Sequence, residues 1–335
     1  MRSLKKATAD RTRKESVPES LDAGPPTLAE ATSLTPVQHV DQPRRIVVDR
    51  PATEFESKPI RARRRGHRVF VPDTVIDAWA TDYFCIRAAS VRGDSHRYNG
   101  LPRQDSFIVA HHAESESIVM AVADGVSSAS EAHDGAIEAC RLAVAAALAS
   151  LDQGQLPDWP SIVEGAASGL MELARRATGE DTTVDLAAKM FATTLTVAQM
   201  LPSEGRVGLR ASSIGDSAIW HICDGHLTRL TGGKGQNIDD LFSPSVAALP
   251  WLPSSIELLE LLIDPTDTIV VLSDGIGDAL GDGSSLVADL LKSELRSPPP
   301  PLQVARIADF SRATFADDRT LIAVWPSNPR WGTNG

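Results

Sequence analysis

Cysteine, aromatic side chains and long apolar runs are all scarce in this 335-residue chain. Its three cysteines, Cys85, Cys140 and Cys223, lie far apart and form no CxxC pair. This spacing is typical of reduced thiols in a cytoplasmic protein and does not favour a structural zinc site. No apolar run approaches the roughly 18 residues of a membrane helix, and the N-terminal residues lack the apolar segment of a secretory signal. The sequence therefore predicts a cytoplasmic protein with no membrane partner.

Charge is unevenly distributed along the chain. Residues 1–68 hold 15 Lys and Arg against 9 Asp and Glu, which leaves 18 basic and 35 acidic residues for the remainder. Such an acidic body does not favour attraction to a nucleic-acid backbone, so no nucleic-acid partner is expected. It suits a site in which carboxylates surround divalent cations.

The N-terminal segment differs in composition from the rest. Pro, Ser, Thr, Glu and Arg dominate residues 1–75 and apolar periodicity is weak, which predicts a disordered Pro/Arg-rich tail. Within it, Ile46–Arg50 is a candidate docking strand. The basic run Arg61–Arg65 is interpreted as part of a solvated tail rather than as a nucleic-acid or lipid site. Residues 76–330 are assigned to one domain.

Short apolar, β-branched runs and Ala- and Leu-rich stretches follow the tail. Strands are predicted over residues 84–90, 106–112, 117–123, 191–200, 206–215, 217–223, 268–273 and 320–325. Helices are predicted over residues 135–151, 161–177, 284–296 and 302–314, the last two separated by four consecutive prolines. Because strands come in runs with helices between the runs, we expect antiparallel sheets covered by helices.

Four segments place an aspartate at the end of a predicted strand or in a turn beside one. These aspartates are Asp105, Asp124, Asp274 and Asp317. Mg²⁺ and Mn²⁺ prefer oxygen ligands, and strand ends hold such ligands rigidly. A glycine after Asp124 and after Asp274 lets the backbone turn and brings a carbonyl close to an ion. A single Asp-Gly is usually an ordinary turn, so the prediction of a cation site rests on the four segments occurring together.

The order of these segments resembles that of the protein phosphatase 2C family of metal-dependent phosphatases. The resemblance runs over about residues 83–326 and rests on Val122-Ala123-Asp124-Gly125, Ala192-Thr193-Thr194-Leu195, Ile214-Gly215-Asp216-Ser217, Ser273-Asp274-Gly275 and Asp317-Asp318-Arg319-Thr320. The stretch from Ser90 to Asp105 resembles the opening of a bacterial branch of that family. The resemblance implies an α+β fold, a four-layer α-β-β-α sandwich of two antiparallel sheets flanked by helices, with residues 76–330 as the catalytic domain.

The same resemblance implies a hydrolase that removes phosphate from phosphoserine or phosphothreonine in a phosphoprotein, with a kinase as a further candidate partner. Two Mn²⁺ or Mg²⁺ ions are expected, with a hydroxide between them as the nucleophile. The implied metal ligands are Asp105, Asp124, the Gly125 carbonyl, Asp274 and Asp317. Asp105, Asp124 and His96 are the implied catalytic residues, with His96 as proton donor to the leaving oxygen, although a structural histidine is the simpler interpretation. The oligomeric state is left open.

Several departures from the family pattern keep an alternative open. Gln104 occupies the position of a family glutamate, and Gly100 that of a phosphate-binding arginine, for which His96, Arg97 or Arg103 could substitute. Ser127-Ser128 replaces the usual Gly-Gly-His, with His133 further on. The alternative is therefore a catalytically impaired pseudophosphatase that binds a phosphoprotein or kinase as a sensor. A hydrolase of small phosphoesters is a third hypothesis. Asp181 and Asp185 both qualify as a third-metal ligand, and Asp216 is assigned to a turn.

Overall fold

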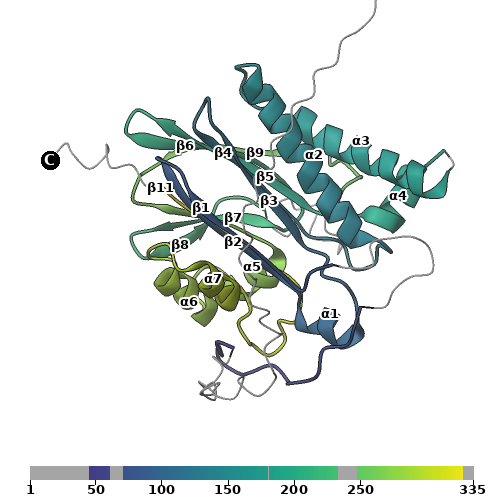
Figure 1. Cartoon of the computed structure of the whole chain (residues 1–335), viewed down its shortest axis with the longest axis horizontal. Helices are drawn as coiled ribbons and strands as arrows, with labels where there is room; N and C mark the ends of the chain where they lie inside the picture. Colours follow the sequence, from purple (N-terminus) through teal and green to yellow (C-terminus); the bar gives the residue numbers. More distant parts are fainter. Residues whose placement is uncertain (1–44, 61–70, 180, 233–246, 327–335) are drawn as a thin grey trace, which may run out of the picture. The chain divides into compact units, whose positions relative to one another are not determined.

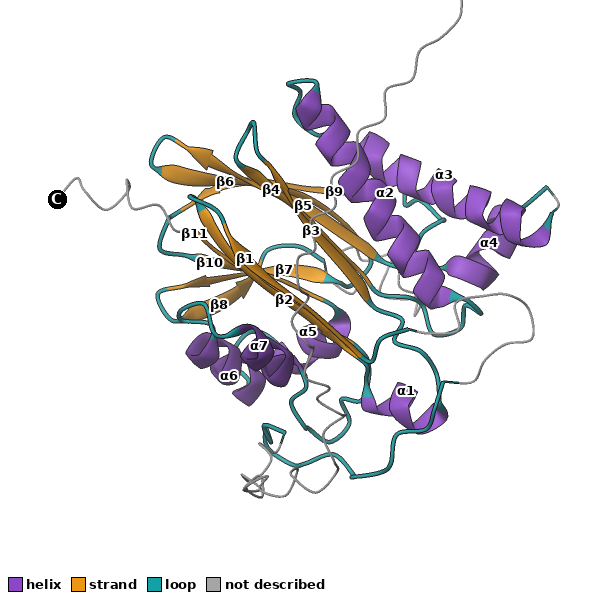
Figure 2. Cartoon of the chain, in the orientation of Figure 1, coloured by secondary structure: helices purple, strands orange, loops and turns teal. Residues whose placement is uncertain are grey.

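The computed structural model describes residues 45–60, 71–179, 181–232 and 247–326. Two antiparallel sheets pack face to face, and helices cover both outer faces (Figures 1 and 2). The predicted four-layer α+β sandwich is confirmed. Among the helices that the structure describes, none combines the length and apolarity needed to cross a membrane.

Six strands form the first sheet, and every neighbouring pair in it is antiparallel. Their spatial order is β1 (Thr74–Ala80), β2 (Phe84–Val91), β11 (Arg319–Pro326), β10 (Thr268–Leu272), β7 (Ala218–Cys223) and β8 (His226–Arg229). The predicted hairpin turn at Asp224-Gly225 joins β7 to β8, and both turn residues have positive φ.

Five antiparallel strands form the second sheet. Their spatial order is β3 (Ser106–His112), β4 (Ser117–Ala123), β5 (Leu195–Ser203), β6 (Arg206–Ile214) and β9 (Glu257–Ile263). All seven residues of β4 are buried because the strand has the first sheet on one side and helices on the other. This double burial explains why its sequence is almost continuously apolar rather than alternating.

The helices divide between the two outer faces. The second sheet carries α2 (Ala132–Asp152), α3 (Trp159–Thr178) and α4 (Val184–Phe191), and the first carries α5 (Asp274–Leu280), α6 (Leu286–Glu294) and α7 (Pro301–Ala308). A short helix, α1 (Asp94–Asn99), follows β2. In α2 the buried alanines recur every three or four residues, so one small-residue face lies close to the sheet.

Most predicted elements are present, with differences at their ends. Residues 191–194 belong to the end of α4 and the segment after it, not to a strand, and the helix predicted over 302–314 ends at Ala308. The prediction missed α1, α4 and α5, which are eight residues or shorter, and the strands β1, β8 and β9. The β9 sequence ELLELLI consists of good helix formers, so here pairing with β6 outweighs local propensity.

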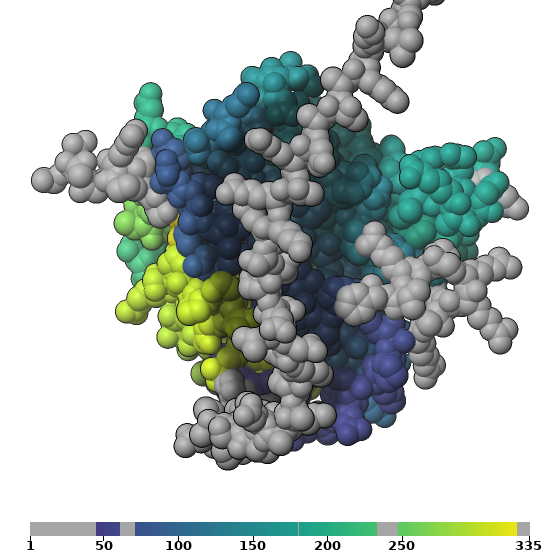
Figure 3. Space-filling view, in the orientation of Figure 1, coloured from purple at the N-terminus to yellow at the C-terminus, as the bar shows by residue number. Residues whose placement is uncertain are grey.

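Residues 45–60 lie against the folded body although they fall within the predicted tail. The Val48 amide donates to the Ser311 carbonyl at 2.9 Å, and the Lys58 amide donates to the Arg97 carbonyl at 2.9 Å. In Figure 3 this segment is purple and borders the blue surface that follows it in sequence. The disorder predicted for residues 1–44 and the basic run at 61–65 lie outside the described residues.

Candidate metal centre

Strand register brings the four predicted aspartates to one edge of the sandwich. In the second sheet Ser106 of β3 pairs with Ala123 of β4, so Asp105 and Asp124 are neighbours at that edge. In the first sheet Leu272 of β10 pairs with Leu321 of β11, which places Asp274 beside the residues that precede β11. Because the two sheets pack face to face, each supplies two aspartates to a common site.

Asp105 connects the two sheets. It is 2% exposed, and its Oδ2 accepts a hydrogen bond from the Thr320 hydroxyl at 2.7 Å. Since the Thr320 proton is used there, the Ser90 hydroxyl, 2.7 Å from Thr320 Oγ1, must donate to Thr320, and Arg103 donates to Ser90 at 2.6 Å. This chain of donors fixes one oxygen of Asp105, whereas Oδ1 is buried without a hydrogen-bond partner.

Asp124 is held through its backbone by the segment after α4. The Thr194 hydroxyl accepts from the Asp124 amide at 2.9 Å, and the Thr194 amide donates to the Asp124 carbonyl at 2.8 Å. The next residue, Gly125, has no room for a side chain, because a Cβ there would lie 2.8 Å from Ala132 atoms. These contacts leave the Asp124 carboxylate free to face the other aspartates.

Asp274 and Asp317 complete the group. Asp274 begins α5 directly after β10, and its Oδ1 is buried without a hydrogen-bond partner. Asp317 precedes β11 and its side chain is 55% exposed. The residue after Asp274 packs tightly against the other segment, because a Cβ on Gly275 would overlap the Asp318 carbonyl. A glycine is therefore required there by close backbone approach.

Neighbouring carboxylates contribute to raised pKa values of Asp105, Asp124 and Asp274. Burial raises the pKa of Asp105 to about 7, and the charge of Asp318 and then that of Asp317 add to this effect. Burial also raises the pKa of Asp124 well above its ordinary value, and Asp105, Asp274 and Asp317 raise it further. Burial raises the pKa of Asp274 to about 6, although a hydrogen bond with Asp124 lowers it. Four carboxylates thus share a site in which they cannot all be charged cheaply.

This donor set fits a hard divalent cation. Two carboxylate oxygens, Asp105 Oδ1 and Asp274 Oδ1, are buried and unpartnered, as is the amide oxygen of Gln104. Such oxygens are costly to bury without a proton or cation nearby. Mg²⁺ and Mn²⁺ take oxygen ligands and would offset the repulsion among the four aspartates. Asp105, Asp124, Asp274 and Asp317 are thus suitably placed to hold such ions.

Asp318, next to Asp317, has a different environment. It is 1% exposed and accepts hydrogen bonds from the backbone amides of Gly93, at 2.6 Å, and Gln104. It also lies 2.8 Å from Nδ1 of His96. One buried carboxylate therefore ties the start of β11 to the segment before α1 and to the segment before β3. In the sequence Asp318 is only the neighbour of Asp317, and nothing there marks its role.

His96, which belongs to α1, lies beside the carboxylates of Asp317 and Asp318. It is 4% exposed, with Nε2 3.9 Å from Asp317 Oδ1. Burial lowers the pKa of His96, but the contact with Asp318 and the charges of Asp317 and Asp105 outweigh burial and raise it above its ordinary value. The neighbouring carboxylates therefore shift His96 toward its protonated form.

The arginines suggested as substitutes for the family's phosphate-binding residue already have partners. Arg97 pairs with Asp73 at 2.8 Å and with Asp309 at 3.0 Å. Arg103 donates to Ser90 and to the Asp105 backbone carbonyl. Both guanidinium groups thus join segments of the protein to one another: Arg97 links α1 to Asp73 and Asp309, and Arg103 links Ser90 to the backbone of Asp105. Asp216, close enough to Asp274 to raise its pKa, is 6% exposed.

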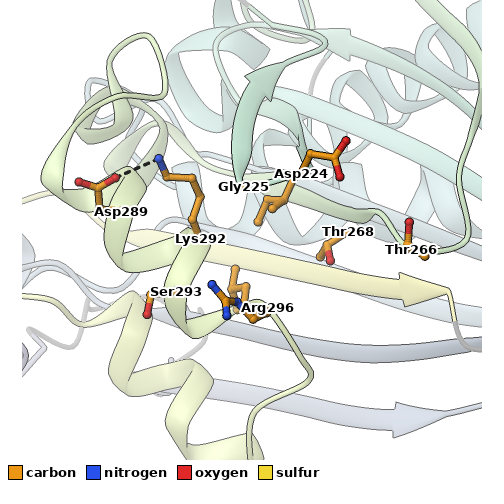
Figure 4. Close-up of a pocket in the computed structure, with 10 residues that line it drawn as sticks. Asp224, Gly225, Thr266, Thr268, Asp289, Lys292, Ser293 and Arg296 are labelled. Carbon is orange, nitrogen blue, oxygen red and sulfur yellow. Dashed lines mark ion pairs between the residues drawn. The ribbon is translucent and has the colours of Figure 1, made fainter.

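A pocket of about 600 Å³ lies elsewhere, between the β7–β8 hairpin and the end of α6 (Figure 4). None of the four aspartates lines it. Its walls include Asp224 and Thr266 as well as Lys292, which forms an ion pair with Asp289 at 2.9 Å. The candidate centre is therefore defined by converging carboxylates and not by this hollow.

An α-β-β-α sandwich with an acidic edge defines a class of phosphatase-like proteins. The family model for protein phosphatase 2C matches residues 92–298, more than half of the chain, and the protein belongs to that family. No curated protein matches it significantly.

Solved structures of similar fold include RsbX in complex with magnesium, with 13% identity and a TM-score of 0.50 over 76% of this chain and 100% of that one. A further match is the PPM Ser-Thr phosphatase MsPP from Mycobacterium smegmatis in complex with cacodylate, with 22% identity and a TM-score of 0.49 over 72% of this chain and 97% of that one. At 13% identity, the likeness to RsbX concerns the fold alone.

Replacing Asp318 by alanine should lower the free energy of unfolding by about 2–4 kcal/mol, since two buried amides would lose their acceptor. Asp317→Ala is the matched control, and because Asp317 is exposed it should change stability by less than about 0.5 kcal/mol. Urea unfolding in the presence of a chelator measures both. Equal effects of the two substitutions on the free energy of unfolding would contradict the view that Asp318 stabilises the fold and Asp317 does not.

Without divalent cations, stability should fall as pH rises. Asp105 and Asp274 have folded-state pKa values of about 7 and 6, above the ordinary 3.8, so the folded state keeps protons that the unfolded chain releases. The raised pKa of His96 acts in the same direction. We expect the free energy of unfolding to fall by at least about 1.4 kcal/mol between pH 5 and 7.5, the value for one group shifted by one unit.

Urea unfolding in chelator at several pH values measures this slope. Asp105→Asn removes one shifted group and should flatten it, and Mg²⁺ should stabilise the protein more at pH 7.5 than at pH 5. Stability that stays constant or rises with pH in chelator would show that the carboxylates do not interact as described.

Proposed function

We propose that the protein is an Mn²⁺- or Mg²⁺-dependent phosphatase acting on phosphoserine and phosphothreonine in other proteins. The observation that carries the proposal is the meeting of four aspartates from two sheets. Burial raises the pKa values of Asp105, Asp124 and Asp274, and neighbouring carboxylates add to this effect. Membership of the protein phosphatase 2C family supports the same activity.

In this proposal Asp105, Asp124, the Gly125 carbonyl, Asp274 and Asp317 hold two divalent cations. When bound, such ions neutralise phosphoryl oxygens and acidify a water molecule. The chain itself supplies rigid placement: Thr320 and Ser90 orient Asp105, and Thr194 positions the Asp124 backbone. A phosphorylated protein is the expected partner, with its kinase as a second candidate.

His96 is assigned as the proton donor to the seryl or threonyl oxygen that leaves. Asp318 contacts Nδ1 and favours the imidazolium, while Nε2 lies toward the exposed Asp317. A protonated ring with one nitrogen held by a carboxylate can deliver its other proton in a fixed direction.

The central test is hydrolysis of a phosphothreonine peptide with Mn²⁺. Asp124→Ala should lower kcat/KM at least about 1,000-fold, because loss of cation binding removes several kcal/mol of transition-state stabilisation. Asp282→Ala, which removes an exposed carboxylate in the loop after α5, is the control and should leave the rate unchanged. Phosphate release measures both.

Two results would overturn this proposal. Binding of the phosphopeptide with no turnover in Mn²⁺ would identify a pseudophosphatase that acts as a sensor. A higher kcat/KM on small phosphorylated metabolites than on phosphoproteins would identify a hydrolase of small phosphoesters.

The role of His96 can be tested by varying the leaving group. His96→Gln should lower kcat on phosphothreonine about 100-fold, because an alkoxide needs a proton as it departs. On p-nitrophenyl phosphate, whose leaving group is far more acidic, the loss should stay within about threefold. Equal losses on both substrates would indicate that His96 is only structural.

A further inference from the structure

Three side chains with metal-binding atoms meet at the opposite end of the first sheet from the four aspartates. His221 and Cys223 are two residues apart on β7, so they point to the same face. Thr268 of β10 pairs with Ile222, which sets Asp267 opposite Cys223. Register alone thus brings an imidazole, a thiol and a carboxylate together from two adjacent strands.

The three groups are close in space. His221 Nε2 lies 2.8 Å from Asp267 Oδ2, and the donor atoms of His221, Cys223 and Asp267 all lie within 4.8 Å of one another. Asp267 is 6% exposed. Within the described residues Asp267 contacts His221, the backbone amide of Asp264 and the Cys223 thiol, and neither Lys nor Arg pairs with it. No described residue therefore places a permanent positive charge beside this nearly buried carboxylate.

The carboxylates of Asp267 and Asp224 both lie near the Cys223 thiol. A cation that bound here would replace the thiol proton and supply a positive charge that no described residue supplies to Asp267.

We propose that His221, Cys223 and Asp267 form a binding site for Zn²⁺ or a similar borderline-soft cation, separate from the acidic centre. Zinc takes tetrahedral sites built from thiolate, imidazole and carboxylate, at distances of roughly 2.0–2.3 Å. The three donor atoms lie within 4.8 Å of one another, so small side-chain movements would bring them onto one ion. Water or the neighbouring Asp224 completes the fourth position.

This site differs in position and chemistry from the acidic centre. Asp267 and Asp274 stand at opposite ends of β10, and at about 3.3 Å per residue a strand of that length separates the two sites by roughly 20 Å. The acidic centre offers oxygen donors, whereas this one offers nitrogen, sulfur and oxygen. A cation here would join β7 to the turn before β10 and take no part in phosphate hydrolysis.

The test uses the full chain, from which bound metal is removed with a chelator. Excess Mg²⁺ is then added to occupy the acidic centre. Titration with Co²⁺ should produce a thiolate-to-cobalt charge-transfer absorption, and added Zn²⁺ should remove it. Cys223→Ser should abolish this absorption. Cys85→Ser, which removes another half-buried thiol, should keep it. His221→Ala should weaken Zn²⁺ binding at least about tenfold in competition with a chelating dye.

The cobalt absorption is measured without any substrate, so this test does not depend on the proposed phosphatase activity. The rate of hydrolysis in Mg²⁺ should be the same for Cys223→Ser and the parent protein. The proposal is overturned if no thiolate absorption develops, or if the absorption survives in Cys223→Ser. The His221–Asp267 contact would then serve only to fix the turn between β9 and β10.

Discussion

Crowding of like charges at one edge of the sandwich is the constraint on which the rest of the structure depends. Burial raises the pKa values of Asp105, Asp124 and Asp274, and the charges of nearby carboxylates raise them further, so the folded chain carries an unfavourable interaction that water would relieve. The sheets keep these carboxylates together because the strand register fixes the ends of β3, β4, β10 and β11 at the same edge. The three apolar layers, between the sheets and under each helical face, supply the opposing free energy.

Two adjacent aspartates show how the fold separates stability from chemistry. Asp317 is more than half exposed and adds charge to the cluster. Asp318 is buried and accepts hydrogen bonds from backbone amides of two other segments. The second of these amides belongs to Gln104, directly before Asp105. The anchoring carboxylate thus also positions a residue of the acidic centre. Residues 55–60 support the same region from outside, since Phe55 and Lys58 both pack on Tyr98 of α1.

The sequence predicted those parts of the site that a strand end makes visible. An aspartate after an apolar run, followed by glycine, marks Asp124 and Asp274 without any structure. The role of Asp318 could not be predicted this way, because a buried acceptor and an exposed ligand look identical when they stand side by side. Only its hydrogen bonds to residues more than 200 positions away distinguish it.

The same limit applies to the far end of the first sheet. Widely spaced cysteines did not favour zinc, since that inference depends on ligands that are close in sequence. Cross-strand pairing makes sequence distance irrelevant: Asp267 and Cys223 are 44 positions apart, yet the register places them opposite each other just beyond the last ladder pair, Thr268 with Ile222. Local propensity failed for β9 for a related reason, because its partner strand decides its conformation.

Two sites of unlike donors in one chain would also sort the cations they receive. Zinc binds most N, O and S sites more tightly than magnesium or manganese does, so an oxygen-only centre cannot reject zinc by affinity alone. A site with thiolate and imidazole favours zinc more strongly than carboxylates do. When zinc is limiting, the proposed His221–Cys223–Asp267 site would fill first and leave the acidic centre to the hard ions that phosphoryl chemistry uses.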